Sequence, residues 1–284
     1  MTSRDTPSPA ATDAASPAGY RLGDREFETF RAMVLRDMGI SLSAEKRALV
    51  AGRLMKRLRH FGLTSYQDYL ALALDEKNED ERRVLLNLLT TNETHFFRED
   101  EHFGFLAKTV IPARSPSAVF RAWSAACSTG EEAYTIAMVL AEHIPASSWE
   151  VMGSDANDDV LSQARSGVYP ISAREEIPEP YLKKYCLKGV RSQEGTLLID
   201  PAFAAGIRFL QINLVKPLPV IGLFDVVFLR NVMIYFNRKT KREVLERIIP
   251  SLKPGGYLFV GHMESLMGIG VELRKAAPSV YRVP

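Results

Sequence analysis

The chain has 284 residues, of which 46% are apolar and 25% are charged. This composition excludes a chain that is disordered throughout, because it supplies enough apolar side chains for one large domain or two ordinary ones. A formal net charge of +2 gives no general affinity for nucleic acid or membrane, so any basic binding site has to be local.

The N-terminal stretch MTSRDTPSPAATDAASPAG is rich in Ser, Pro and Ala, and residues 1–19 are expected to form a disordered tail. It lacks the apolar core of a signal peptide, and no other stretch reaches the roughly 18 apolar residues that cross a bilayer. Two distant cysteines, Cys127 and Cys186, show no metal-ligand spacing and favour free thiols. We therefore predict a cytoplasmic protein without membrane insertion or a metal site.

Residues 20–90 carry apolar side chains at helical spacing, which predicts an all-α N-terminal domain. Gly39 and Gly62 are predicted helix stops, and TSYQ after Gly62 has the spacing of a capping box. The stripes are Phe27, Phe30, Val34 and Met38; Val50, Leu54, Leu58 and Phe61; and Val84, Leu85, Leu88 and Leu89.

The helix expected to begin near Ser43 has a basic face beside its apolar stripe. On the residues alone, a solvated surface is the favoured interpretation of such a face. Its members are Lys46, Arg53, Lys56, Arg57 and His60.

Residues 91–112 are predicted to link this domain to the rest of the chain. The segment TTNETHFFRED, residues 90–100, is too polar for a core and too aromatic for a plain linker. It raises the question of what its polar side chains bind.

Residues 113–284 alternate short apolar runs with helical patterns, which predicts a doubly wound parallel sheet with ligands at the carboxyl ends of its strands. Residues 170–206 interrupt this order and are predicted to form a small inserted antiparallel β-subdomain. Near the end, SVYRV is placed to fold back beside the last parallel strand, as in methyltransferases that use S-adenosylmethionine. The predicted strands are VFRAWSAA, WEVMGSD, IRFLQINL, FDVVFLRNV and GYLFVGH.

Polar residues follow three of these strands. Glu131 and Glu132 begin the helix after a turn of small residues, where they suit a cationic or amine-bearing ligand or cap the helix dipole. Asp155 ends the second strand, where an acidic residue often binds ribose hydroxyls, although SDAND is also an ordinary helix cap. Arg230 and Asn231 end another strand, where they bind a ligand or simply terminate it.

Five stretches together resemble the chemotaxis receptor glutamate methyltransferases, the CheR family, in the same order along the chain. The resemblance covers the chain after its N-terminal tail. It implies a Rossmann-like S-adenosylmethionine methyltransferase domain behind the all-α domain. The stretches are TTNETHFFRE, SAACSTGEEAY, SDANDDVLSQARSGVY, FLRNVMIYF and LKPGGYLFVGHMES.

The resemblance implies an enzyme that transfers a methyl group from S-adenosylmethionine to glutamate side chains on chemoreceptor signalling helices. Arg98 and Tyr235 are implied to face the reaction centre, and TTNETHFFRED to fold over the methionine end of the cofactor. The implied cofactor residues are Asn92, Thr94, Arg98, Glu132, Asp155, Asn213, Leu214, Arg230 and Asn231.

The implied substrate is an acidic receptor helix, which turns the basic face into a candidate binding surface through Lys46, Arg53, Lys56 and Arg57. In some relatives the β-subdomain binds a receptor C-terminal peptide; here KGVRSQEG departs from the tighter glycine-rich turn expected for that role. Alternatives are an S-adenosylmethionine enzyme with another acceptor and a non-catalytic signalling module. A nucleic-acid partner is not expected, because no aromatic stacking platform accompanies the basic face. Nothing in the sequence demands more than a monomer.

Overall fold

The computed structural model describes residues 20–284, and the tail expected at residues 1–19 lies outside them. Contacts divide the described chain into two units, which we treat separately. The helical unit comprises residues 20–32 and 43–89, and the sheet unit comprises residues 33–42 and 90–284. The short segment 33–42 thus belongs with the sheet unit, whereas the sequence placed it in the helical domain.

The all-α character predicted for residues 20–90 is confirmed. The first helix, α1, extends into the sheet unit's segment 33–42. Gly39, with a φ of 71°, directly follows it, as predicted for a helix stop. The cap of α3 is Ser65, which accepts a hydrogen bond from Asp68 N, one residue later than the capping box expected at TSYQ. The helices are α1 (Asp24–Met38), α2 (Arg47–His60), α3 (Tyr66–Leu74) and α4 (Glu79–Leu89), with a 3-10 turn at Ala44–Lys46 before α2.

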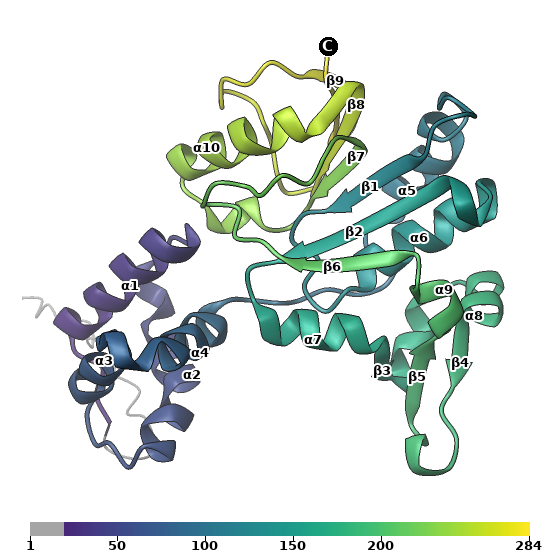
Figure 1. The fold of residues 1–284 in the computed structure, drawn as a ribbon. Coiled ribbons are helices and arrows are strands. Elements are labelled where there is room, and N and C mark those ends of the chain that lie inside the picture. Colours follow the sequence, from purple (N-terminus) through teal and green to yellow (C-terminus); the bar gives the residue numbers. More distant parts are fainter. Residues whose placement is uncertain (1–19) are drawn as a thin grey trace, which may run out of the picture. The chain divides into compact units, whose positions relative to one another are not determined.

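The sheet unit is built on a seven-stranded sheet in the order β6-β2-β1-β7-β8-β10-β9 (Figure 1). Strands β6, β2, β1, β7 and β8 run parallel, and β10 pairs antiparallel with β8. The doubly wound sheet and its reversed final strand were therefore predicted correctly. The strands are β1 (Phe120–Ser124), β2 (Trp149–Asp155), β6 (Ile207–Gln211), β7 (Phe224–Leu229), β8 (Leu252–Val260), β9 (Arg274–Ala277) and β10 (Val280–Arg282).

Alternate residues of the central strands enter two different cores, as the period of two in a strand requires. In β7, Val226 and Phe228 join the cluster that contains residues of α6, whereas Val227 and Leu229 join the cluster that contains α10. The sheet is thus covered on both faces, and its apolar runs are nearly continuous. The sheet unit's other helices are α5 (Glu101–Phe105), a π-helical turn (Leu106–Val110), α6 (Glu131–His143), α7 (Asp158–Ser166) and α10 (Arg238–Ile248).

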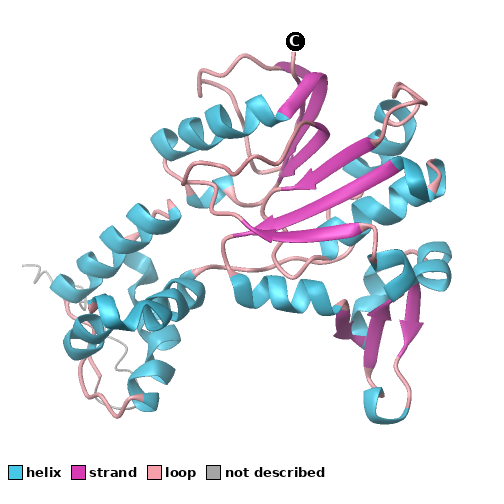
Figure 2. Ribbon diagram, in the orientation of Figure 1, coloured by secondary structure: helices cyan, strands magenta, loops and turns pink. Residues whose placement is uncertain are grey.

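The β-subdomain predicted at residues 170–206 is a three-stranded antiparallel sheet in the order β3-β5-β4 (Figure 2). Its side chains Tyr185, Leu197 and Ile199 are buried in the same cluster as α6. The elements are β3 (Val168–Pro170), α8 (Glu179–Tyr185), β4 (Cys186–Lys188), β5 (Thr196–Ile199) and α9 (Pro201–Ala204).

Within residues 20–284, no helix combines the length and apolar character needed to cross a membrane. Both Cys127 and Cys186 are free thiols, as the sequence predicted.

Candidate functional site

A single cavity gathers the residues that the sequence proposed for a cofactor. It holds about 950 Å³ of space, part of it open to solvent, and all of its lining belongs to the sheet unit. Its lining includes Asn92, Thr94, Arg98, Glu132, Asp155, Asn213, Leu214, Arg230, Asn231 and Tyr235.

Asp155 ends β2 at one wall of the cavity and faces the small-residue turn. Its carboxylate accepts hydrogen bonds from Ser128 N and Asn157 N, each at 3.0 Å. Burial raises the pKa of Asp155, against these backbone donors, which lower it. Asn157, rather than Asp155, caps α7 by accepting from Asp159 N. Each carboxylate oxygen of Asp155 keeps a lone pair with which to accept a ligand hydroxyl.

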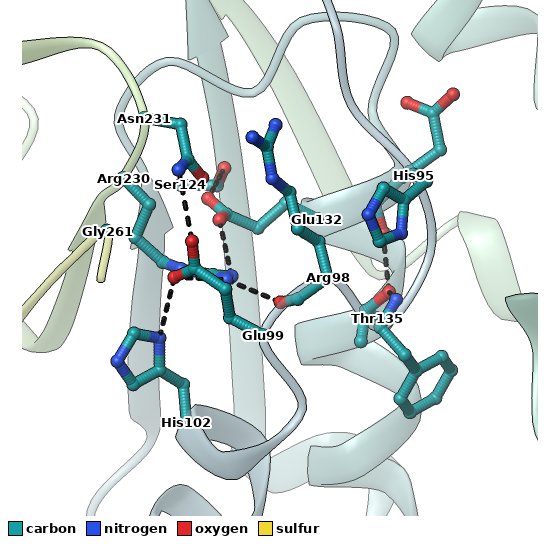
Figure 3. Close-up of polar contacts among 12 residues, drawn as sticks. His95, Arg98, Glu99, His102, Ser124, Glu132, Thr135, Arg230, Asn231 and Gly261 are labelled. Atoms are coloured by element: carbon teal, nitrogen blue, oxygen red, sulfur yellow. Dashed lines mark hydrogen bonds and ion pairs between the residues drawn. The ribbon is translucent and has the colours of Figure 1, made fainter. Parts of the chain in front are cut away.

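Glu132 and Arg230 form a buried ion pair beside the cavity (Figure 3). Arg230 Nη1 lies 3.0 Å from Glu132 Oε2, and Ser124 Oγ donates to Glu132 Oε1 at 2.6 Å. The Arg230 side chain is 1% exposed, and it also binds Glu99 at 3.0 Å. Burial raises the pKa of Glu132, although Arg230 and Ser124 oppose the rise. The guanidinium of Arg230 is therefore largely committed to carboxylates of the protein.

The segment TTNETHFFRED lines the cavity and is held in an unusual backbone conformation. Phe97 and Glu99 have φ values of 52° and 54°, which for residues other than glycine mark strain at a functional segment. Arg98 Nη1 donates to Glu93 O at 2.9 Å, while the carbonyl of Arg98 accepts from Arg230. Figure 3 shows the Arg98 side chain pointing away from Glu99. Most N–H donors of Arg98 are thus left for a ligand.

The two phenylalanines of this segment anchor it in the core of the sheet unit. Phe96 is 1% exposed and packs edge-on against Tyr169, with ring centroids 5.0 Å apart. Phe97 contacts Phe103 and Tyr181. The aromatic residues therefore fix the backbone from which the polar ones reach the cavity.

Sequence reasoning missed the part of the cavity wall that comes from segment 33–42, namely Met38 and Ile40. The segment is attached by Asn213, whose Nδ2 donates to Asp37 O at 2.7 Å. Ser41 N also donates to Tyr235 O at 2.8 Å. Only Gly39 signalled a turn here, and no motif indicated that the turn belongs to the cavity.

The four predicted substrate residues belong to the helical unit and are not among the residues that line the cavity. Lys46 and Lys56 are exposed and Arg53 is half-buried. Arg57 is bound to Glu81, whose side chain is 7% exposed. Arg57 therefore has a structural partner that the sequence interpretation did not assign.

Glu99, His102 and His262 bring three potential ligand atoms within 4.8 Å of one another. The oxygens of Glu99 already accept from Arg230 and Asn231 side chains and from His262 N. A cation bound there would also face the Arg230 guanidinium. We assign no metal to this group.

The sheet is doubly wound with a reversed final strand, and a cavity with a strand-end carboxylate lies at the carboxyl ends of its parallel strands. These features define the class of this protein as a cofactor-binding α/β enzyme of the methyltransferase type. Residues 92–280 match the family described as CheR methyltransferase, SAM binding domain, and residues 25–90 match CheR methyltransferase, all-alpha domain. The chain belongs to the CheR methyltransferase family and uses S-adenosylmethionine. The resemblance seen in the sequence is confirmed.

Its relatives are named as chemotaxis enzymes. The chain is 39% identical to a chemotaxis protein methyltransferase of Escherichia coli, over 92% of this chain and 91% of that protein. It is 36% identical to chemotaxis protein methyltransferase 2 of Pseudomonas aeruginosa, over 90% of this chain and 92% of that protein. Each relative is thus matched over nearly its full length.

Proposed function

We propose that S-adenosylmethionine binds in this cavity and that the enzyme transfers its methyl group to glutamate side chains on chemoreceptor signalling helices. The products are glutamate 5-O-methyl esters and S-adenosylhomocysteine. The observation that carries the assignment is that every residue implied for the cofactor lines one cavity at the carboxyl ends of the parallel strands.

Asp155 is proposed to bind the ribose, because its oxygens retain acceptor capacity toward two hydroxyl groups. The methionine end of the cofactor is assigned to the side of Asn92, Thr94 and Arg98. Asn213 and Leu214 belong to another chain segment of the lining. The side-chain amide of Asn213 already binds Asp37 O and Val215 N, so its backbone is the natural contact.

The reaction needs alignment more than proton transfer. A glutamate side chain with an ordinary pKa near 4.3 is ionised at neutral pH and attacks without a general base. Holding the carboxylate oxygen, methyl carbon and sulfur in line contributes on the order of 7 kcal/mol or more to the lowering of the barrier.

Arg98 and Tyr235 are proposed to orient the reacting groups. A cation bonded directly to the attacking oxygen stabilises the charged ground state more than the transition state, in which that charge is disappearing. Arg98 therefore serves best by binding the cofactor's own carboxylate, or by binding the substrate through its other oxygen. Tyr235 donates a positioning hydrogen bond from its hydroxyl.

The basic face formed by α2 and the 3-10 turn before it is proposed to bind the acidic receptor helix through Lys46, Arg53 and Lys56. Arg57 contributes less in this proposal, because Glu81 neutralises it. Added salt is expected to weaken receptor binding while leaving cofactor affinity nearly unchanged.

A second receptor contact is proposed at the β-subdomain. In its three-stranded sheet β5 is central, so β3 and β4 each carry an outer edge, and strand addition by a receptor C-terminal peptide uses such an edge. The exposed KGVRSQEG loop adjoins β4. We further propose that the enzyme acts as a monomer in the cytoplasm.

The test is isothermal titration of the wild type and Asp155→Ala with S-adenosylhomocysteine, followed by an assay for base-labile methyl esters on a receptor fragment. We expect binding that Asp155→Ala weakens strongly, and esters on receptor glutamates only with wild-type enzyme. Cofactor binding without receptor esters would favour a different methyl acceptor.

A further inference from the structure

Two carboxylates outside the cavity lining, Glu99 and Glu264, hold Asn231, which is part of the lining. Glu99 Oε1 accepts from Asn231 Nδ2 at 3.1 Å, and Glu264 Oε2 accepts from Asn231 N at 3.0 Å. The Glu264 side chain is 5% exposed. Asn231 is thus bound through its side chain and its backbone by different parts of the chain.

Glu264 organises the whole turn that carries Asn231 and Tyr235. Its other oxygen, Oε1, accepts from Ile234 N at 3.1 Å, and Oε2 also accepts from Gly261 N at 2.7 Å. Asn231 itself has a φ of 57°. A buried carboxylate that accepts from these backbone N–H groups holds the strained backbone of this turn in place.

Glu99 determines which atom of the Asn231 amide faces it. Burial raises the pKa of Glu99, but the hydrogen bond from Asn231 and the charge of Arg230 outweigh burial, so the net pKa is lowered. An ionised carboxylate only accepts hydrogen bonds. The NH₂ group of Asn231 must therefore face Glu99, as in Figure 3, and its Oδ1 must point elsewhere.

Gly261 closes the same side of the amide. A Cβ placed on Gly261 would lie 2.8 Å from Asn231 Nδ2 and 3.0 Å from Asn231 N. The NH₂ group of Asn231 is therefore packed between the Glu99 carboxylate and the Gly261 backbone, and the amide oxygen remains for the cavity.

We propose that Glu99 and Glu264 are positioning residues that fix Asn231 as a hydrogen-bond acceptor for an N–H donor of the cofactor. This inference rests on the proposed placement of S-adenosylmethionine in the cavity. The cofactor carries two such donors, the ammonium of its methionine part and the 6-amino group of its adenine.

The proposal predicts that reversing the hydrogen bond between the two side chains preserves function. In Glu99→Gln, the Gln side-chain oxygen accepts the hydrogen bonds from Arg230 and His262 N, so the Gln NH₂ group faces Asn231. The Asn231 amide then has to rotate by half a turn to present its oxygen to this NH₂ group, which places its own NH₂ group toward the cavity. In Asn231→Asp, two carboxylates face each other. In the double variant the Gln NH₂ donates to the Asp carboxylate, whose second oxygen again accepts in the cavity.

Affinity for S-adenosylhomocysteine is measured by isothermal titration, with thermal unfolding of every variant in parallel. We expect each single variant to lose at least tenfold in affinity and the double variant to return to within about threefold of wild type. Glu101→Gln is the matched control: its side chain is 73% exposed on the same segment and outside the cavity lining, and it should bind as wild type does.

A parallel titration with 5′-methylthioadenosine, which keeps the adenine amine and lacks the ammonium, identifies the donor. Loss of affinity for both probes assigns the adenine amine, and loss for S-adenosylhomocysteine alone assigns the ammonium.

The inference is overturned if folded Glu99→Gln binds within twofold of wild type, or if a folded double variant binds no better than the weaker single one. If a single variant fails to fold, the affinity of the double variant for S-adenosylhomocysteine is compared with that of the wild type, and a loss of more than about threefold overturns the inference. A wild type that binds neither probe would overturn the cofactor placement instead.

Discussion

Arg57 shows how a residue on a basic surface can be bound to the fold. Its guanidinium pairs with Glu81, and Arg57 Nε lies 2.9 Å from Glu81 Oε1. Tyr69 donates to the same carboxylate at 2.6 Å. Glu81 is buried and Arg57 is half-buried, so removing Arg57 leaves a buried carboxylate without its cation, which costs more than the pair contributes.

We therefore expect Arg57→Ala to lower the free energy of unfolding by about 3 kcal/mol. Lys56→Ala, an exposed neighbour on the same helix, should change it by less than about 0.5 kcal/mol. Urea unfolding followed by circular dichroism measures both. Equal stability of the two variants would show that the Glu81 pair contributes little.

His102 gives the protein a pH-dependent stability. Burial, together with the charge of Arg230, lowers the pKa of His102 to about 4, against Glu99 and Glu101, which raise it. His262 also faces it, with ring centroids 4.9 Å apart. Since the unfolded chain takes up a proton near pH 6.5 and the folded chain only near pH 4, stability is lost as the pH falls through this window.

Between pH 7 and pH 5 the wild type should lose about 2 kcal/mol more unfolding free energy than His102→Gln. Other buried carboxylates shift the pH profile of both proteins alike, so the difference isolates His102. Denaturant unfolding at the two pH values measures it, and parallel profiles for the two proteins would contradict the assignment.

Among single residues, the sequence predicted the polar residues at strand ends. It missed the carboxylates that bind those residues by hydrogen bonds. Asp155 and Asn231 follow directly from apolar runs. Glu99 and Glu264 became meaningful only through contacts, since Glu99 and Asn231 are 132 positions apart. No local pattern distinguishes such a carboxylate from an exposed one.

Among the elements, α2 and α6 use glycine in opposite ways. Gly52 lies inside α2, and a Cβ there would meet nothing within 4 Å. Gly130 caps α6 with a φ of 97°, and a Cβ there would lie 2.8 Å from Ala164 Cβ. The first glycine only weakens its helix, whereas the second is required by its turn.

Gly52→Ala should thus raise the free energy of unfolding by about 0.5 to 1 kcal/mol. Gly130→Ala should lower it by more than about 1 kcal/mol and weaken S-adenosylhomocysteine binding, because the turn beside Asp155 is displaced. Thermal unfolding and titration of the two variants measure these effects. Changes of the same sign in both would contradict the distinction.

The elements were predicted well where burial is nearly continuous, as in β7, because a buried strand needs an uninterrupted apolar run. Strand β8 begins at Leu252, four residues before the predicted GYLFVGH, and its first half is only partly buried. The cap of α3 was shifted by a residue because both Thr64 and Ser65 suit that position. Contacts group segment 33–42 with the sheet unit, which no local pattern indicated, because its bond to Asn213 spans 176 positions.

At the scale of the whole molecule, the two segments of the sheet unit that connect it to the helical unit, here called the connections, both line the cavity. The chain leaves the sheet unit after Leu42 and returns at Thr90. Met38 and Ile40 before the departure, and Thr90 and Thr91 after the return, all line the cavity. A bound cofactor would contact both connections.

Amide hydrogen exchange should therefore slow in residues 36–42 and 90–94 together when S-adenosylhomocysteine binds, since a ligand that contacts both segments stabilises both against local opening. Mass spectrometry of peptic fragments measures the exchange, and a fragment from α3 serves as the internal control. Protection of only one segment would show that the cavity is completed differently.

The sheet unit is built from two separate stretches of the chain, and this limits how chimeras between this enzyme and its relatives can be made. Replacing the helical unit by that of a relative with another receptor requires chain junctions near residues 42 and 90. It also requires a third junction within α1, because this helix contributes residues to both units. A chimera joined once, at residue 90 alone, would import a foreign cavity wall along with the new helices. A change in methylation by such a chimera would then reflect altered cofactor binding as much as altered receptor binding.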